Sequence, residues 1–297
     1  MKTAFLILSI LLISACQQRE AQHSFSEASF IKRPIPHMHR EVPTELIRSK
    51  YETLKPNEWG ERVTGVQTHF ETSEKEIALT FDACGGPHGN NVDRELIRFL
   101  KEEQVPSTLF INSRWIEENT KLFQQLATDP LFQIENHGTH HQPLSVNGNS
   151  AWGISGTGSV KEVIAEVKEN QKKIEQLTGS KSTLFRSGTA YYDEVAVQIA
   201  KDLGIQIVNY TILGDAGATF SSGQVKNALM TAKPGDIALL HMNQPKKWNV
   251  RRRETIRSYS PRERFYLCST SQPEFAVTTI VLNGHLMNEQ LIRGDNT

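Results

Sequence analysis

Segments with strand-like and helix-like patterns alternate from residue 76 to residue 240, and this alternation limits the possible folds most. Predicted strands are residues 77–81, 107–111, 131–134, 183–185, 205–212 and 237–240. Predicted helices are residues 92–103, 121–127, 160–177, 194–203 and 224–232. Strands separated by helices imply right-handed crossovers and a parallel sheet, either open or closed into a barrel.

Length and charge limit the number of domains and the class of partner. A chain of 297 residues can hold one large α/β domain or two small ones. Its 33 basic and 33 acidic side chains cancel, so charge gives no reason to expect nucleic acid as a partner. The sequence gives no signal for a protein partner either.

The first 16 residues resemble a lipoprotein-type signal peptide. A charged start is followed by the apolar run 4–13, which is too short to span a bilayer, and then by small residues. Residues 13–16 resemble the bacterial lipoprotein box, which implies that Cys16 becomes the lipidated first residue after cleavage. We therefore expect a lipid-anchored protein of the cell envelope, on its periplasmic or extracellular side. The alternative is a plain signal peptide with a chance cysteine.

The remaining organisation follows from composition. Residues 17–70 are polar, contain scattered prolines and show no sustained period, so we expect a linker and an irregular extension. Residues 71–245 carry the alternating pattern and form the expected catalytic domain. Within it, the Gly-, Ser- and Asn-rich stretch 145–159 is expected to be a long surface loop.

A histidine cluster follows the third predicted strand. His137, His140 and His141 lie within five residues, directly after an apolar run. A turn at a strand end can direct two of these side chains at one point, and neutral imidazole is a common zinc ligand. His137 and His141 are therefore candidate metal ligands; the alternative is a polar loop that happens to be rich in histidine.

Other polar side chains also follow predicted strands. Catalytic groups of parallel α/β folds collect at the carboxyl ends of strands. The candidates at such ends are Asp82, His137, His141, Arg186, Asp215 and His241. Each alone is more often structural, but together they fit a metal-assisted hydrolase.

The ordered motifs resemble those of one family. The motifs are Thr80-Phe81-Asp82, His137-Gly138-Thr139-His140-His141, Arg186-Ser187-Gly188, Asp215 and Leu239-Leu240-His241. Over about residues 71–245 they are similar to the polysaccharide deacetylase (NodB-homology) family. The resemblance implies a distorted (β/α) barrel of parallel strands that removes acetyl groups from N-acetylglucosamine polymers or peptidoglycan. It also implies one divalent metal, with zinc expected and other divalent ions open.

The resemblance also implies roles for single residues. His137 and His141 would bind the metal, and Asp82 would be the general base for the attacking water. Arg186 would orient Asp82 and keep it ionised.

The same resemblance also implies which residue acts as the general acid. His241 would protonate the leaving amine, and Asp215 would tune His241.

Several positions depart from the family pattern. The family has a second aspartate as third metal ligand where this chain has Ala83, which cannot coordinate an ion. Three outcomes stay open: two histidines completed by water, a substitute ligand from His88 or Cys84, or no metal. Gly188 replaces a usual proline. Asp215 is followed by Ala-Gly-Ala and lacks the usual tryptophan, so its correspondence is the weakest.

The tail, residues 246–297, lacks the turn, helix and closing strand that the family implies. Codons for residues 248–253 and 261–268, read one base later, can spell that missing segment, and Lys246-Lys247 can be encoded by a run of adenines. Our hypothesis is an out-of-frame tail from about Trp248, which leaves the barrel incomplete at its C-terminal end; the alternative is a divergent tail. On this view Cys268 is an accident of frame, and we expect no disulfide with Cys84.

The sequence therefore predicts a metal-dependent hydrolase that acts on a carbon–nitrogen, non-peptide bond in an N-acetylated glycan. Two alternatives remain: a catalytically impaired relative that binds glycan, and a hydrolase of another non-peptide C–N bond.

Overall fold

The structure is a computed structural model that describes residues 42–245 and two short strands at 267–268 and 279–281. All of them belong to the unit Pro36–Thr297. The helices are α1 Thr44–Tyr51, α2 Arg94–Glu102, α3 Ser113–Glu118, α4 Thr120–Ala127, α5 Val160–Thr178, α6 Glu194–Asp202 and α7 Ser222–Leu229. The main-sheet strands are β2 Glu76–Ala83, β3 Ser107–Ile111, β4 Phe132–Asn136, β5 Leu184–Phe185, β7 Gln206–Ile207, β8 Ile212–Leu213, β9 Ile237–His241, β10 Leu267–Cys268 and β11 Thr279–Val281.

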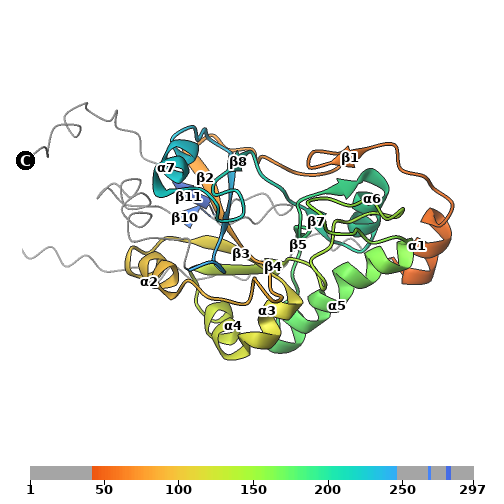
Figure 1. The fold of residues 1–297 in the computed structure, drawn as a ribbon, viewed down its shortest axis with the longest axis horizontal. Helices are drawn as coiled ribbons and strands as arrows, with labels where there is room; N and C mark the ends of the chain where they lie inside the picture. Colours follow the sequence, from red (N-terminus) through yellow and green to blue (C-terminus); the bar gives the residue numbers. More distant parts are fainter. Residues whose placement is uncertain (1–41, 246–266, 269–278, 282–297) are drawn as a thin grey trace, which may run out of the picture. The chain divides into compact units, whose positions relative to one another are not determined.

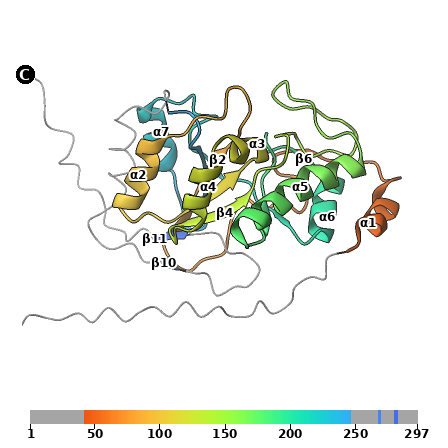
Figure 2. The ribbon, with the colours of Figure 1, turned by 90° about the horizontal axis from the view of Figure 1, so that it is seen from below.

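Seven of these strands are parallel and run in the order β8-β9-β2-β3-β4-β5-β7. They curl into a half-barrel, which confirms the predicted α/β fold of the distorted-barrel type (Figure 1). Every residue of β2 is buried, as expected for a central strand of a parallel sheet. Helices α4 and α5 contact β4 and pack beside it (Figure 2).

The strand predicted at 205–212 is broken in two. β7 pairs with β5, whereas β8 pairs with β9 on the other side of the sheet. The short connection between β7 and β8 therefore passes from one edge of the curled sheet to the other, which is the distortion of the barrel. Sequence alternation alone could not reveal this break, because both halves carry the same apolar pattern.

Helix ends follow the expected chemistry. The side chain of Asp93 caps α2 by accepting from the Leu96 N–H, and Ser159 caps α5 by accepting from the Glu162 N–H. Gly179 ends α5 in the left-handed conformation at φ 72°, which glycine adopts without steric cost.

The segment before the barrel differs from the expectation of irregular structure. Helix α1 forms at Thr44–Tyr51 and contacts α5 and α6. Ile47, Tyr51 and Val63 are buried in a core cluster with residues of these helices. A short ladder also joins β1 (Trp59–Gly60) to β6 (Tyr192–Asp193). Tertiary packing supplies the stability that the polar sequence of this segment did not indicate.

Helix α3 was likewise not predicted. Its buried side is short and is made by Trp115 and Ile116, too few residues to give a helical period. The loop expected at 145–159 is present, although Ser145 and Thr157 inside it are fully buried and hydrogen-bonded to each other.

The tail is described only at β10 and β11. These two strands pair antiparallel, and β11 pairs antiparallel with the first residues of β2. The predicted signal peptide with Cys16, most of the linker and the rest of the tail lie outside the described residues. In the part of the chain that is described, no helix is both long and apolar enough to cross a bilayer.

Candidate active site

Asp82 and Arg186 form a buried ion pair at the carboxyl end of the sheet. Asp82 lies near the end of β2, and Arg186 directly follows β5. Arg186 donates from Nη1 to Asp82 Oδ1 at 2.8 Å, and their side chains are 0% and 4% exposed. A buried pair of this kind is retained only where further hydrogen bonds satisfy it.

Arg186 has those further partners. It donates to the Thr80 hydroxyl at 2.8 Å, to the Val208 carbonyl at 3.3 Å and to the Asn209 carbonyl at 3.1 Å. Its guanidinium also stacks on the ring of Phe110, 4.2 Å from the centroid. Val208 and Asn209 lie in the break between β7 and β8, so Arg186 satisfies backbone carbonyls that a continuous strand would have paired.

The surroundings keep Asp82 ionised. Burial has the largest influence and would raise the pKa of Asp82, but the positive charge of Arg186, with His137 and His241, outweighs it and lowers this pKa. Asp82 Oδ2 faces His137 Nε2 at 3.7 Å. The carboxylate is thus a charged acceptor directed at the histidine cluster.

His137 and His141 both present a ring nitrogen without a partner. His137 Nδ1 lies 3.0 Å from the Arg186 carbonyl, which fixes Nδ1 as the donor and leaves Nε2 free. The Nε2 atoms of both histidines are buried and have no hydrogen-bond partner among the described residues. The pKa of His137 is lowered, mainly by burial, so the ring is neutral and able to bind a metal.

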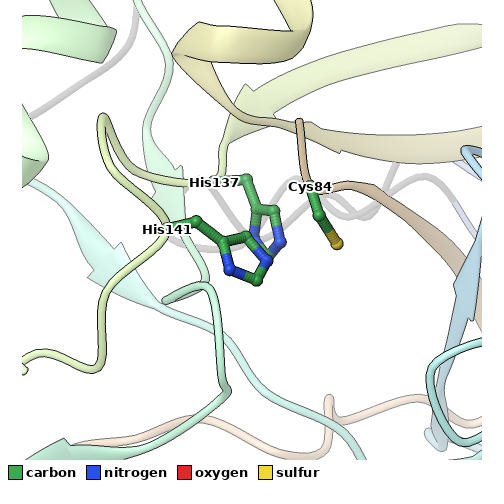
Figure 3. A group of neighbouring side chains, drawn as sticks. All are labelled: Cys84, His137 and His141. Atoms are coloured by element: carbon green, nitrogen blue, oxygen red, sulfur yellow. The ribbon is translucent and has the colours of Figure 1, made fainter. Parts of the chain in front are cut away.

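The two rings lie edge to face with centroids 5.0 Å apart (Figure 3). His141 has a left-handed backbone, φ 64°, which is uncommon for a residue with a side chain and occurs often at functional sites. This turn directs His141 back toward His137.

A buried carboxylate holds the turn. Glu166 on α5 accepts from the backbone N–H of His140 at 2.8 Å and of Gln142 at 3.2 Å. Glu166 is 1% exposed, and burial raises its pKa to about 7. Sequence reasoning missed this residue, although an acidic side chain three residues after Val163, on the apolar side of a helix, was the available signal.

Gly188 lies against the same turn. A Cβ at Gly188 would fall 2.4 Å from the carbonyl carbon, carbonyl oxygen and Cγ of His141. The glycine that replaces the usual proline is thus required by the close approach of His141.

Cys84 joins the two histidines. The ligand atoms of Cys84, His137 and His141 all lie within 4.8 Å of one another (Figure 3). Burial alone would raise the pKa of the Cys84 thiol, but the imidazoles of His141 and His241 lower it to about 6. His88, the other candidate substitute, is exposed and lies outside this group.

These donors fit a divalent metal ion. Two neutral imidazoles with partnerless buried nitrogens and a thiol are ligands that zinc prefers. Ala83, at the end of β2, is buried in the hydrophobic core and takes no part in this group.

Asp215 and His241 form the second pair of the site. Asp215 is fully buried and accepts from the His241 backbone N–H at 2.8 Å, while its Oδ1 lies 2.7 Å from His241 Nδ1. Burial would lower the pKa of His241, but the Asp215 carboxylate outweighs it and raises this pKa well above its ordinary value. Asp215, whose correspondence to the family pattern was the weakest in the sequence, thus contacts His241 directly.

The two pairs belong to one site. Asp82 and His241 are direct neighbours in the register of β2 and β9, and His241 contributes to the lowered pKa of Asp82. The structure therefore brings all six candidates together: Asp82, His137, His141, Arg186, Asp215 and His241. The arrangement places an ionised carboxylate, a group of two imidazoles and a thiol, and a carboxylate-paired imidazole within one centre.

Comparison with known proteins relates this chain to one family. Residues 69–208 match the family model of polysaccharide deacetylases. A curated relative, the chitooligosaccharide deacetylase of Rhizobium leguminosarum bv. phaseoli, is 23% identical over 176 residues, which cover 59% of this chain and 71% of the relative.

Solved structures share the fold. A family 4 carbohydrate esterase pseudoenzyme from Bacillus anthracis has a TM-score of 0.54 and 20% identity, covering 65% of this chain and 63% of that one. A family 4 carbohydrate esterase from Streptomyces lividans, in complex with acetate, has a TM-score of 0.51 and 17% identity, covering 69% of this chain and 96% of that one. At these identities the likeness concerns the fold alone. The matched domain, residues 69–208, belongs to the polysaccharide deacetylase family.

Proposed function

We propose that this protein is a metal-dependent hydrolase that removes N-acetyl groups from an N-acetylated glycan, either a chitin-like polymer or peptidoglycan. The observation that carries the proposal is the buried Asp82–Arg186 pair, which faces His137. Within the part of the chain that the structure describes, the Nε2 atoms of His137 and His141 have no hydrogen-bond partner. A buried carboxylate beside vacant imidazole nitrogens is the donor set that metal-assisted hydrolysis uses.

In this proposal each side chain of the site has a role in hydrolysis. A divalent ion held by His137 and His141 would supply Lewis-acid polarisation of the acetamide carbonyl. Asp82 takes the proton of the attacking water, and Arg186 keeps Asp82 ionised and oriented. His241, whose pKa is raised by Asp215, stays protonated and donates to the nitrogen of the leaving amine.

Acetate release tests the proposal. The full chain, loaded with zinc, is incubated with acetylated chito-oligomers, with peptidoglycan and with a panel of unrelated amides. We expect acetate from the glycans, and we expect His141→Ala to abolish both metal binding and turnover. The exposed His88 lies outside the group, so His88→Ala is the matched control and retains both. Release only from the other amides points instead to another C–N bond, and full activity of His141→Ala contradicts the proposal.

Ala83 favours a second candidate function. Without the second aspartate of the family pattern, the protein could bind glycan and not hydrolyse it. This candidate predicts glycan binding with no acetate release and no effect of a chelator on binding.

We also propose a location and a correction of the tail, both of which rest on sequence alone. Lipidation of Cys16 would anchor the protein in the cell envelope, and labelling with a radioactive fatty acid that is lost in Cys16→Ala checks it. Sequencing the gene across Lys246-Lys247 checks the reading frame. Acetate release is best measured both on this chain and on one whose tail follows the shifted frame.

A further inference from the structure

Cys84 directly follows β2 and carries a thiol, close to the position where the family pattern has a carboxylate. Side chains alternate between the two faces of a strand. Ala83, the position of the usual ligand, packs into the hydrophobic core. Thr80 and Asp82 occupy the opposite face, where both accept hydrogen bonds from Arg186. Cys84 follows Asp82 by two residues and so continues the face that carries the site.

The structure brings Cys84 to the histidines. Its Sγ and the ring nitrogens of His137 and His141 lie within 4.8 Å of one another. Ligand atoms of a tetrahedral zinc site lie roughly 3.5 Å apart. Any two of the three atoms therefore need to approach each other by about 1.3 Å at most, within reach of small side-chain rotations.

We propose that Cys84 is the third protein ligand of a divalent ion of the zinc type, held together with His137 and His141. This inference rests on the proposed function and specifies its metal centre. The thiol releases its proton to solvent when the ion binds, so thiolate and two neutral imidazoles coordinate it.

The ligand set determines which ions the site accepts. Thiolate and imidazole suit zinc and related transition ions, whereas magnesium, calcium and manganese prefer oxygen ligands. With sulfur in place of a carboxylate, the site is expected to discriminate against those oxygen-seeking ions. A fourth position stays open for water or substrate, as in other catalytic zinc sites.

The loop after Cys84 is shaped to hold it there. Gly85 and Gly86 both have left-handed backbones, at φ 71° and 78°, and a Cβ at Gly85 would fall 2.6 Å from the Trp115 backbone nitrogen. Arg114 also reaches the Cys84 carbonyl at 3.5 Å. The backbone of Cys84 is thus fixed against α3, while Asp82, the nearest competitor as a ligand, is held by Arg186.

X-ray absorption at the zinc edge tests the proposal on the full zinc-loaded chain. We expect one sulfur at about 2.3 Å from zinc, with nitrogen or oxygen neighbours at about 2.0–2.1 Å. Cys84→Ser should remove the sulfur signal and weaken zinc binding by at least the roughly 10- to 100-fold that loss of an outer ligand partner costs. Cys268→Ser is the matched control and should keep the sulfur. Cobalt substitution gives a second readout, because a bound thiolate produces near-ultraviolet charge-transfer absorption.

The outcomes separate this inference from the proposed function. Zinc bound by nitrogen and oxygen alone overturns the role of Cys84, and acetate release by that same chain leaves the hydrolase standing. Sulfur-bound zinc without acetate release supports the ligand set and favours the glycan-binding alternative. An unchanged sulfur signal in Cys84→Ser, or no zinc in the wild-type chain, also overturns the inference. If Cys84→Ser does not fold, the wild-type spectrum still decides.

Discussion

Arg186 Nη1 lies 2.8 Å from Asp82 Oδ1, across 104 residues of chain. Asp82 lies near the end of β2 and Arg186 directly follows β5, with β3 and β4 between these two strands in the sheet. The same guanidinium also donates to the carbonyls of Val208 and Asn209, between β7 and β8. One side chain therefore both keeps the Asp82 carboxylate ionised and binds the backbone at the break between β7 and β8.

Asp82→Asn should lower acetate release by about 10²- to 10⁴-fold, because an amide cannot take the proton of the attacking water. It should also reduce the free energy of unfolding, since the buried Arg186 loses its counter-charge; breaking a buried pair costs about 3–5 kcal/mol. Urea denaturation and acetate release measure the two effects separately. Turnover close to wild type in a folded Asp82→Asn chain would exclude Asp82 as the base.

Asp215→Asn should change the pH profile. His241 must be protonated to donate, so activity is present below its pKa and is lost as pH rises through it. Burial lowers the pKa of His241, but the Asp215 carboxylate raises it by more, so the net shift is upward. Removing the carboxylate charge therefore moves the alkaline limb of the kcat profile to lower pH. Glu118→Gln, an exposed charge change outside the site, serves as control, and an unmoved limb in Asp215→Asn argues against His241 as the acid.

Glu166→Gln should loosen the histidine turn. A glutamine can keep one of the two backbone hydrogen bonds to His140 and Gln142, but its amide end opposes the other N–H. We expect a loss of about 1–3 kcal/mol in stability and zinc affinity roughly 10- to 100-fold lower. Glu169→Gln on the exposed side of α5 is the matched control. Equal zinc affinity in both variants would mean that Glu166 has no part in positioning the ligands.

Gly188→Ala should displace His141. The added methyl would meet the His141 backbone and ring at 2.4 Å, so the turn must move, at a cost of about 1–3 kcal/mol. Zinc content and thermal unfolding measure the effect. Gly223→Ala, where a methyl meets nothing within 4 Å, should be neutral. A Gly188→Ala chain with full zinc content would show that the turn is adaptable.

Much of the fold followed from local patterns. The strands at 107–111 and 237–241 are short runs buried along nearly their whole length, and such runs between turn signals predict strands of a parallel sheet. The long helix at 160–178 has one buried face of regular spacing, which gives a clear helical period. Helix α1 was missed, since its short amphipathic pattern gains stability only by packing on α5 and α6.

The sequence by itself determined the alternation of strands and helices and the residue types at strand ends. The side-chain period within each segment and the succession of segments along the chain can both be read locally. Only the tertiary structure decided that Cys84, and not His88, stands beside His137 and His141. It alone also decided that Glu166 holds their turn and that Asp215 contacts His241. Such contacts join residues far apart in the chain, and their distances depend on how the sheet curls and where it breaks, which no local pattern encodes.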